Sequence, residues 1–158
     1  MEASCRKGYY CNAGAEYECA VNTYNDGENA TNLGNCTQCP EGTLSELTAL
    51  TTLTGCRNCS KGKWCSAGKE IPCSVGFYND AEGGDSMVAC KPCPEGSYCP
   101  ASASTALKCE AGTFQGAEGQ PSCRICPAGS FSANVLSCEL CNVGEYCPKG
   151  SVVGAPCP

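Results

Sequence analysis

The chain has 158 residues, of which 19 are cysteine, and its formal net charge is −6. This cysteine density, roughly one residue in eight, is typical of small disulfide-stapled domains in secreted or cell-surface proteins. The ten Lys and Arg residues never cluster, which argues against a nucleic-acid groove or a polybasic membrane-surface patch. With three Phe, one Trp and two Met, the chain cannot build one large core. Disulfides, worth about 2–4 kcal/mol each, must therefore offset much of the conformational entropy lost on folding.

The N-terminus does not look like a secretory leader. Met1 is followed by Glu, Ala and Ser before the first cysteine, and no stretch approaches the ~18–20 apolar residues of a membrane span. A disulfide protein must pass through an oxidising compartment. We therefore expect that a leader has been removed or that the sequence is an excerpt of a longer one. The predicted location is extracellular or at the cell surface.

A six-residue phrase recurs along the chain: Cys, two residues, Gly, one residue and an aromatic residue. In two copies a residue departs from this pattern, with Asn22 at the Gly position and Leu44 at the aromatic position. Asn is the non-Gly residue that best tolerates a left-handed backbone, so the phrase predicts a tight turn with positive φ at its fourth residue. We expect the aromatic residue to cover a neighbouring disulfide as a local core. The nine phrases begin at Cys5, Cys19, Cys39, Cys59, Cys73, Cys93, Cys109, Cys126 and Cys141.

Two kinds of cysteine pair follow from the spacing. A box has five residues between its cysteines, and a loop opens with the phrase and closes on a cysteine 12 to 17 positions later. The boxes are Cys5/Cys11, Cys59/Cys65, Cys93/Cys99 and Cys141/Cys147. The loops are Cys19/Cys36, Cys39/Cys56, Cys73/Cys90, Cys109/Cys123 and Cys126/Cys138.

This pairing in chain order is favoured, but spacing alone does not prove connectivity. Interleaved pairing, such as Cys93–Cys109 with Cys99–Cys123, stays open. Cys157 is left over where the next loop would open. We therefore expect the array to be cut in mid-unit, with Cys157 unpaired or crosslinked to another chain.

The order of boxes and loops divides the chain into repeats. Residues 1–56 hold a box and two loops, 57–90 a box and a loop, 91–138 a box and two loops, and 139–158 a truncated fourth repeat. Frequent Gly, Pro, Asn and Ser favour turns and short hairpins; only Ser45–Thr54 could form a helical turn or a strand, and its four Thr favour strand or coil. Units this small must stack on their neighbours. The predicted fold class is a small disulfide-rich repeat rod, mostly irregular, with short β-hairpins and little helix.

The phrases CPEGSYCP, CEAGTF, CRICPAGSFS and CTQCPEGT resemble the ephrin-receptor-like cysteine-rich repeat, which is similar in style to tumour-necrosis-factor-receptor and furin-like modules. The resemblance covers essentially the whole chain. It implies a disulfide-rich extracellular rod of irregular β structure. In such families the repeats space or stiffen receptor ectodomains, and they also occur in large surface proteins of single-celled eukaryotes.

Five Cys-x-x-Cys pairs raise the alternatives of zinc binding and redox activity. Cys36/Cys39 with Cys56/Cys59 has the spacing of a four-cysteine zinc site. Zinc would leave the boxes and single loops unexplained, and the chain has no His. We therefore predict that these pairs are junctions between disulfide-stapled units and that the chain has no metal centre. The other three pairs are Cys90/Cys93, Cys123/Cys126 and Cys138/Cys141.

Two acidic stretches make calcium the one cofactor that the residues suggest. Oxygen ligands at alternate positions can bind Ca²⁺, but neither stretch has the full twelve-residue pattern, so exposed turns are favoured. The stretches comprise Asn25, Asp26 and Glu28, and Asn79, Asp80, Glu82 and Asp85.

Three Asn-x-Ser/Thr sequons are candidate N-glycosylation sites, at Asn29, Asn35 and Asn58. Two of them carry a cysteine in the middle position, which hinders access, so Asn29 is the expected site. The Thr- and Ser-rich stretches 43–54 and 102–105 are candidates for O-linked sugars.

No residue pattern points to catalysis. Without His there is no Ser–His or Cys–His nucleophile pair, and no metalloprotease, phosphate-loop or dinucleotide motif is present. We predict a structural protein: a stiff, glycosylated building block of a surface coat, stalk or filament. Its partners would be proteins or further copies of itself, with no nucleic acid and no membrane insertion. The alternative is a ligand-binding or adhesion module of a receptor ectodomain, for which Leu44–Leu53 is the candidate apolar patch.

Overall fold

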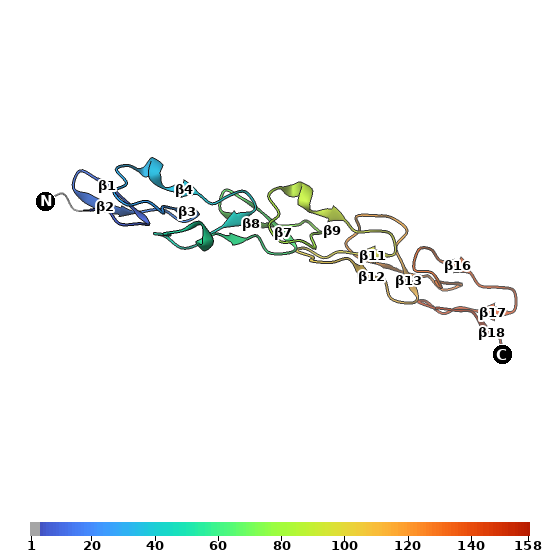
Figure 1. Ribbon diagram of the computed structural model, residues 1–158. Helices are drawn as coiled ribbons and strands as arrows, with labels where there is room; N and C mark the ends of the chain where they lie inside the picture. The colour runs from blue at the N-terminus through green and yellow to red at the C-terminus, as the bar shows by residue number, and fades with distance from the viewer. Residues whose placement is uncertain (1–3) are drawn as a thin grey trace. The chain divides into compact units, whose positions relative to one another are not determined.

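The computed structural model describes residues 4–158 (Figure 1). The chain forms two compact units. The first runs to Ile71 and includes Ala81–Ala89, and the second comprises Pro72–Asp80 and Cys90–Pro158. Within residues 4–158 the helices are single 3₁₀ turns, and none has the length and apolar character that a membrane crossing requires.

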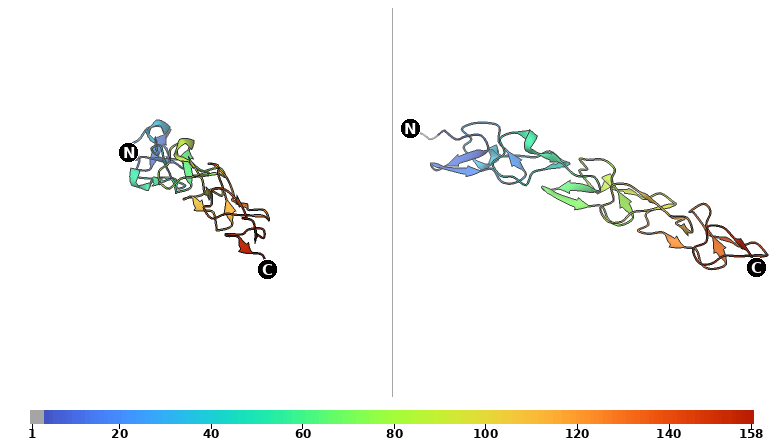
Figure 2. Two further views of the ribbon diagram at one scale, coloured as in Figure 1. Left: turned by 90° about the vertical axis from the view of Figure 1, so that its right-hand side faces the viewer. Right: turned by 90° about the horizontal axis from the view of Figure 1, so that it is seen from below.

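The regular structure consists of two-stranded antiparallel sheets, seen as short arrows between irregular loops (Figure 2). Each pairs the end of a phrase with the residues just before the next phrase. The first five pairs are β1 (Tyr9–Asn12) with β2 (Ala15–Glu18), β3 (Thr23–Tyr24) with β4 (Thr37–Gln38), β5 (Thr43–Leu44) with β6 (Arg57–Asn58), β7 (Lys63–Ser66) with β8 (Lys69–Pro72), and β9 (Phe77–Tyr78) with β10 (Lys91–Pro92). The other four are β11 (Ser97–Tyr98) with β12 (Leu107–Lys108), β13 (Thr113–Phe114) with β14 (Arg124–Ile125), β15 (Ser130–Phe131) with β16 (Glu139–Leu140), and β17 (Glu145–Tyr146) with β18 (Ala155–Pro156).

The long loops end in a 3₁₀ turn directly before their closing cysteine. These turns are η1 (Leu33–Asn35), η2 (Leu53–Gly55) and η3 (Met87–Ala89). Over Ser45–Thr54 the only regular features are a single bridge at Leu50 and the start of η2, so this segment is mainly coil. The predicted disulfide-rich fold of short hairpins with little helix is confirmed.

The predicted tight turn is also confirmed. In every phrase the N–H of the fifth residue donates to the carbonyl of the second, and the fourth residue has positive φ, as a type II turn requires. The fourth residue is Gly in eight phrases, with φ between 72° and 87°. In the second phrase it is Asn22, with φ 62°, so Asn replaces Gly where the backbone is left-handed.

Consecutive phrases are tied by one recurring backbone hydrogen bond. The N–H of an opening cysteine donates to the carbonyl of the turn residue in the phrase before it. In the first unit Cys39 donates to Asn22 at 2.9 Å, and in the second Cys109 donates to Gly96 at 2.9 Å. Within a unit, each phrase therefore sets the position at which the next one begins.

A second layer of contacts reaches two phrases along the chain. A loop tip with positive φ donates its N–H to the first cysteine of the preceding phrase, as Gly83 does to Cys59 at 2.9 Å. The carbonyl of the same tip lies against Gly42, so closely that a Cβ there would overlap the oxygen of Gly83. Glycine is thus required at this turn by its left-handed backbone and by lack of space.

Candidate functional site

Nine disulfides staple the described residues. They follow chain order, with Cα–Cα distances of 5.6–6.2 Å, and each cysteine of a Cys-x-x-Cys pair is bonded outside that pair. Cys157 is free and exposed, and its N–H donates to Gly144 at 2.9 Å, the bond made by opening cysteines elsewhere. The bonds are Cys5–Cys11, Cys19–Cys36, Cys39–Cys56, Cys59–Cys65, Cys73–Cys90, Cys93–Cys99, Cys109–Cys123, Cys126–Cys138 and Cys141–Cys147.

In two phrases the sixth residue covers the disulfide of the next box. Leu44, only 2% exposed, packs with the Cys59–Cys65 disulfide. In the second unit Tyr78 packs against Cys93–Cys99. The predicted local core is confirmed at these two places, while Tyr146, at 50% exposure, remains largely open to solvent.

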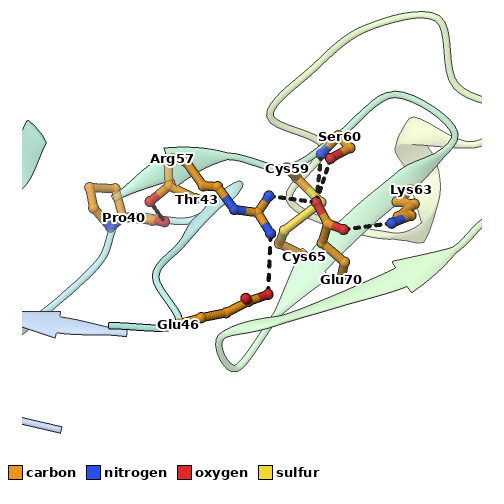
Figure 3. The surroundings of a disulfide bond; sticks show 9 residues. All are labelled: Pro40, Thr43, Glu46, Arg57, Cys59, Ser60, Lys63, Cys65 and Glu70. Atoms are coloured by element: carbon orange, nitrogen blue, oxygen red, sulfur yellow. Dashed lines mark hydrogen bonds and ion pairs between the residues drawn. A yellow bond between two sulfur atoms is a disulfide. The ribbon is translucent and has the colours of Figure 1, made fainter. Parts of the chain in front are cut away.

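The densest group of charged contacts surrounds Glu70 on β8, beside the Cys59–Cys65 disulfide (Figure 3). One carboxylate oxygen, Oε1, accepts from Arg57 Nη1 at 2.8 Å and from the backbone N–H and hydroxyl of Ser60 at 3.0 and 2.7 Å. The other, Oε2, accepts from Lys63 Nζ at 2.6 Å. The Glu70 side chain is 14% exposed, so much of its hydration is replaced by these donors.

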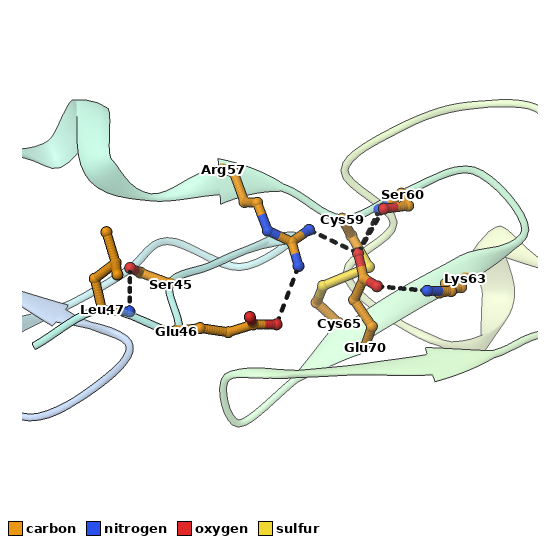
Figure 4. A network of polar contacts seen from close by, with 9 residues as sticks. All are labelled: Ser45, Glu46, Leu47, Arg57, Cys59, Ser60, Lys63, Cys65 and Glu70. Carbon is orange, nitrogen blue, oxygen red and sulfur yellow. Dashed lines mark hydrogen bonds and ion pairs between the residues drawn. A yellow bond between two sulfur atoms is a disulfide. The ribbon is translucent and has the colours of Figure 1, made fainter.

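These donors hold the pKa of Glu70 well below its ordinary value, the hydrogen bonds from Lys63 and then Arg57 being the largest causes. The same contact raises the pKa of Arg57. Figure 4 shows that Arg57 also reaches Glu46, whose carboxylate lies 3.4 Å from Nη2. Arg57 therefore links the Cys39/Cys56 loop to the β7–β8 hairpin through two carboxylates. Charge pairing with exposed partners of this kind stabilises local structure and supplies no acid or base poised near neutral pH.

Sequence reasoning did not identify this cluster, although the repeat contained a signal for it. Glu16 lies 54 positions before Glu70 and makes the corresponding contact, accepting from the backbone N–H of Arg6 at 3.2 Å and from Arg6 Nε at 3.0 Å. A carboxylate on the closing strand of the hairpin, bonded to the backbone N–H of the second residue of the preceding phrase, is thus a shared feature of the first two boxes.

The seventh position, directly after each phrase, was also missed. In boxes this position is the second cysteine. In loops it is a polar residue, which is buried despite its polarity. Asn25 is 5% exposed, and its amide donates to the Tyr9 carbonyl at 2.8 Å and accepts from Gly27 N–H at 3.0 Å. The amide thereby fills the place that a disulfide occupies in a box. The polar residues at this position are Asn25, Ser45, Asn79, Gln115 and Ser132.

The carboxylates of the stretches predicted as calcium candidates lie on exposed turns, whereas Asn25 and Asn79 are buried. The Oδ1 of Asn25 is occupied by a backbone N–H, and Asp80 pairs with Lys91 at 2.8 Å. Asp26 and Glu28 are exposed. Among residues 4–158, the one cluster with ligand-like spacing is Cys5, Cys11 and Glu16, and its two sulfurs are joined in a disulfide. Calcium binding stays a prediction.

The three sequon asparagines all lie exposed in the first unit. Asn29 sits at the tip of the Cys19/Cys36 loop, Asn35 in η1, and Asn58 on β6. The first unit also has a shallow groove, whose polar lining includes Asn22, Thr43 and Asp85.

The proposed apolar patch at Leu44–Leu53 divides into buried and exposed parts. Leu44 belongs to the core, so including it in a surface patch was wrong. Leu50 is half-buried against Gly55. Leu47 and Leu53 are 65% and 48% exposed and remain as the surface leucines of this loop.

Residues 96–137 match the family model described as tyrosine-protein kinase ephrin type A/B receptor-like. No curated protein is similar enough to count as a relative. The matched segment includes the whole Cys109–Cys123 loop and the phrases that begin at Cys109 and Cys126. Repeats of this family are non-catalytic, disulfide-rich ectodomain modules, and an extracellular or cell-surface location fits them. Residues 96–137 therefore carry an ephrin-receptor-like cysteine-rich repeat.

Proposed function

We propose that the chain is a structural repeat segment of an extracellular protein, a building block of a surface coat, stalk or filament. The observation that carries this proposal is the recurring bond from an opening cysteine to the preceding turn residue, made in both units. A disulfide closes the loop or box that each of the nine phrases opens. Repetition of this contact between consecutive phrases within each unit supports a spacer, whose length grows with the number of its phrases.

An in-register deletion tests the proposal. Removing residues 19–72 joins Glu18 to Cys73 and takes out three complete disulfides. The β1–β2 hairpin then leads into the Cys73 loop, as β7–β8 does in the intact chain. We expect the shortened protein to fold, reach the cell surface and join the same assembly, with a smaller distance between fluorescent tags at its two ends.

A matched deletion of residues 19–62 removes Cys59 but keeps its partner Cys65. This variant should fail to fold, which shows that register matters more than the length removed. Loss of surface assembly in the in-register variant, despite six remaining correct disulfides, would contradict a spacer role, because a spacer tolerates the loss of whole repeats.

The second candidate is a ligand-binding or adhesion module, which the ephrin-receptor-like match and the exposed Leu47 and Leu53 favour. Changing both leucines to Ser should leave folding intact, because neither is in the core. Leu50 is left unchanged because it packs against Gly55. If capture of a cell-surface protein depends on these two side chains, the binding role is favoured; unchanged capture and assembly remove this patch from consideration.

A further inference from the structure

The three sequons differ in the residue between the asparagine and the hydroxyl residue. In the sequon of Asn29 that residue is Ala30, whereas the sequons of Asn35 and Asn58 have Cys36 and Cys59 in the middle. Both cysteines are bonded, so forming the native disulfide fixes the centre of each of these two sequons. A glycosyltransferase must bind all three sequon residues, and a crosslinked centre hinders that binding.

The surroundings of Asn58 make its sequon still less accessible to a glycosyltransferase. Asn58 pairs with Thr43 between β6 and β5, and Cys59 is completely buried. The hydroxyl of Ser60, the third sequon residue, donates to Glu70 at 2.7 Å. The hydroxyl that the enzyme must recognise is therefore engaged within the fold.

The sequon of Asn35 is part of a helix cap. Its Oδ1 accepts from the N–H groups of Thr31 at 3.1 Å and Asn32 at 3.2 Å, which completes the capping box of η1. Cys36 follows at once and is bonded to Cys19. Once η1 has formed, this sequon cannot straighten without breaking its cap and straining the disulfide.

A backbone hydrogen bond fixes Asn29 in place, while its side-chain amide nitrogen remains exposed to solvent. Its N–H donates to the Cys5 carbonyl at 2.7 Å, and its φ of 58° turns the residue outward at the loop tip. The side chain is exposed, and its Oδ1 accepts from the Ser4 hydroxyl at 3.1 Å. Thr31, the third residue of the sequon, is exposed as well. A bulky sugar can project from this tip without displacing a buried group.

We propose that Asn29 is the N-glycosylation site of this chain and that Asn35 and Asn58 stay unmodified. The co-substrate is a glycosyl diphospholipid of the secretory pathway. The amide nitrogen of Asn29 attacks the anomeric carbon of the donor sugar, forming the N–C bond as the C–O bond to the diphosphate breaks. The diphospholipid leaves with the electron pair, and one amide proton passes to a base of the transferase. The proposal rests on the extracellular assignment made above.

The test expresses the full chain behind a secretory leader in eukaryotic cells. The secreted protein is treated with peptide-N-glycosidase in ¹⁸O water, and its peptides are analysed by mass spectrometry. We expect ¹⁸O-labelled Asp at position 29, and Asn without label at positions 35 and 58. Asn29→Gln and Thr31→Ala should each abolish the mobility shift caused by the glycan, while Thr31→Ser should retain it.

Asn35→Gln and Asn58→Gln are matched controls and should leave the glycan in place. Thr31→Ala keeps Asn29 itself in its left-handed turn, so loss of the sugar is separated from loss of the fold. An unmodified Asn29 in secreted protein with nine native disulfides would overturn the proposal, and so would full occupancy at Asn35 or Asn58. Because the added leader forces secretion, this result is independent of the native location, which antibody labelling of intact cells tests separately.

Discussion

The turn glycines do two things at residue scale: they supply positive φ, and at several phrases they make room for a loop tip two phrases further on. Gly112 has φ 82°, and a Cβ there would overlap the carbonyl oxygen of Gly150. Gly129 has φ 85° with no heavy atom near its missing Cβ. Comparing alanine substitutions at these two glycines therefore separates the cost of backbone strain from the cost of steric crowding.

Gly129→Ala should cost only the left-handed backbone strain, about 1–2 kcal/mol. Gly112→Ala should cost more, because the Gly150 tip must also move and its N–H bond to Cys126 is disturbed. Hydrogen exchange at the Gly150 amide measures the difference. Equal protection of this amide in the two variants would show that the overlap is relieved without cost.

Glu70 gives a pH prediction. Its pKa is held below the ordinary value, so the cluster stabilises fully at pH values above about 4.5, and the contribution is lost as the pH falls below that value. Glu70→Gln should weaken the fold by about 1–2 kcal/mol at neutral pH. The difference in unfolding free energy between Glu70→Gln and the native protein should become smaller toward pH 3. Exchange of the Ser60 amide, a direct donor to Glu70, follows this effect.

Glu41→Gln, at an exposed position of the third phrase, is the control and should change Ser60 exchange little at any pH. A stability difference between Glu70→Gln and the native protein that does not change with pH would show that the charge of Glu70 contributes nothing. The side chain would then stabilise the fold only through its packing and its neutral hydrogen bonds.

At the scale of one element, box and loop are variants of a single design. The seventh residue uses the same backbone bonds in both: Cys99 accepts from Gly76 N–H, and Gln115 accepts from Gly96 N–H, at 2.8 and 2.7 Å. Box and loop differ in whether the seventh residue forms a disulfide or buries a polar side chain. In the loop that contains Asn25, its side-chain amide donates to the Tyr9 carbonyl and accepts from the Gly27 N–H.

Asn25→Ala should therefore destabilise the first unit by about 1–3 kcal/mol, since it removes two hydrogen bonds at a buried position. The loss should appear as faster hydrogen exchange at Gly27 and Gly8, whose N–H groups bond to the side chain and the backbone of Asn25. The neighbouring exposed change Asp26→Ala serves as the control. If both variants exchange alike, the buried amide is not a structural substitute for the disulfide.

At the scale of the whole molecule, the disulfide map leaves one thiol. Cys157 is exposed, and the other eighteen cysteines are bonded. A maleimide applied under native conditions should label one cysteine per chain, at Cys157, and Cys157→Ser should take up none. Labelling at any other cysteine would mean that the pairing is incomplete or different. In that case, non-reducing peptide mapping of the same sample identifies which disulfides differ from the expected nine.

Sequence predicted most of the local backbone and little of the side-chain chemistry. Asn22 in place of Gly revealed the left-handed turn, because few residue types tolerate that backbone. The role of Leu44 as cover for a disulfide followed from its phrase position, although its place in a surface patch did not hold. Neither the Glu70 cluster nor the burial of Asn25 was foreseen, since each depends on which segments meet in space.

The sequence by itself determined the repeat, the positions of the turns and the disulfide-rich hairpin class, because these depend on residues close together in the chain and on a spacing that recurs. Only the tertiary structure decided which polar groups are buried, why Gly42 must be glycine, and how Glu70 is shared by Arg57 and Lys63. Those properties arise when one phrase is laid against the next, where the available space and the hydrogen-bond partners are set by residues many positions away.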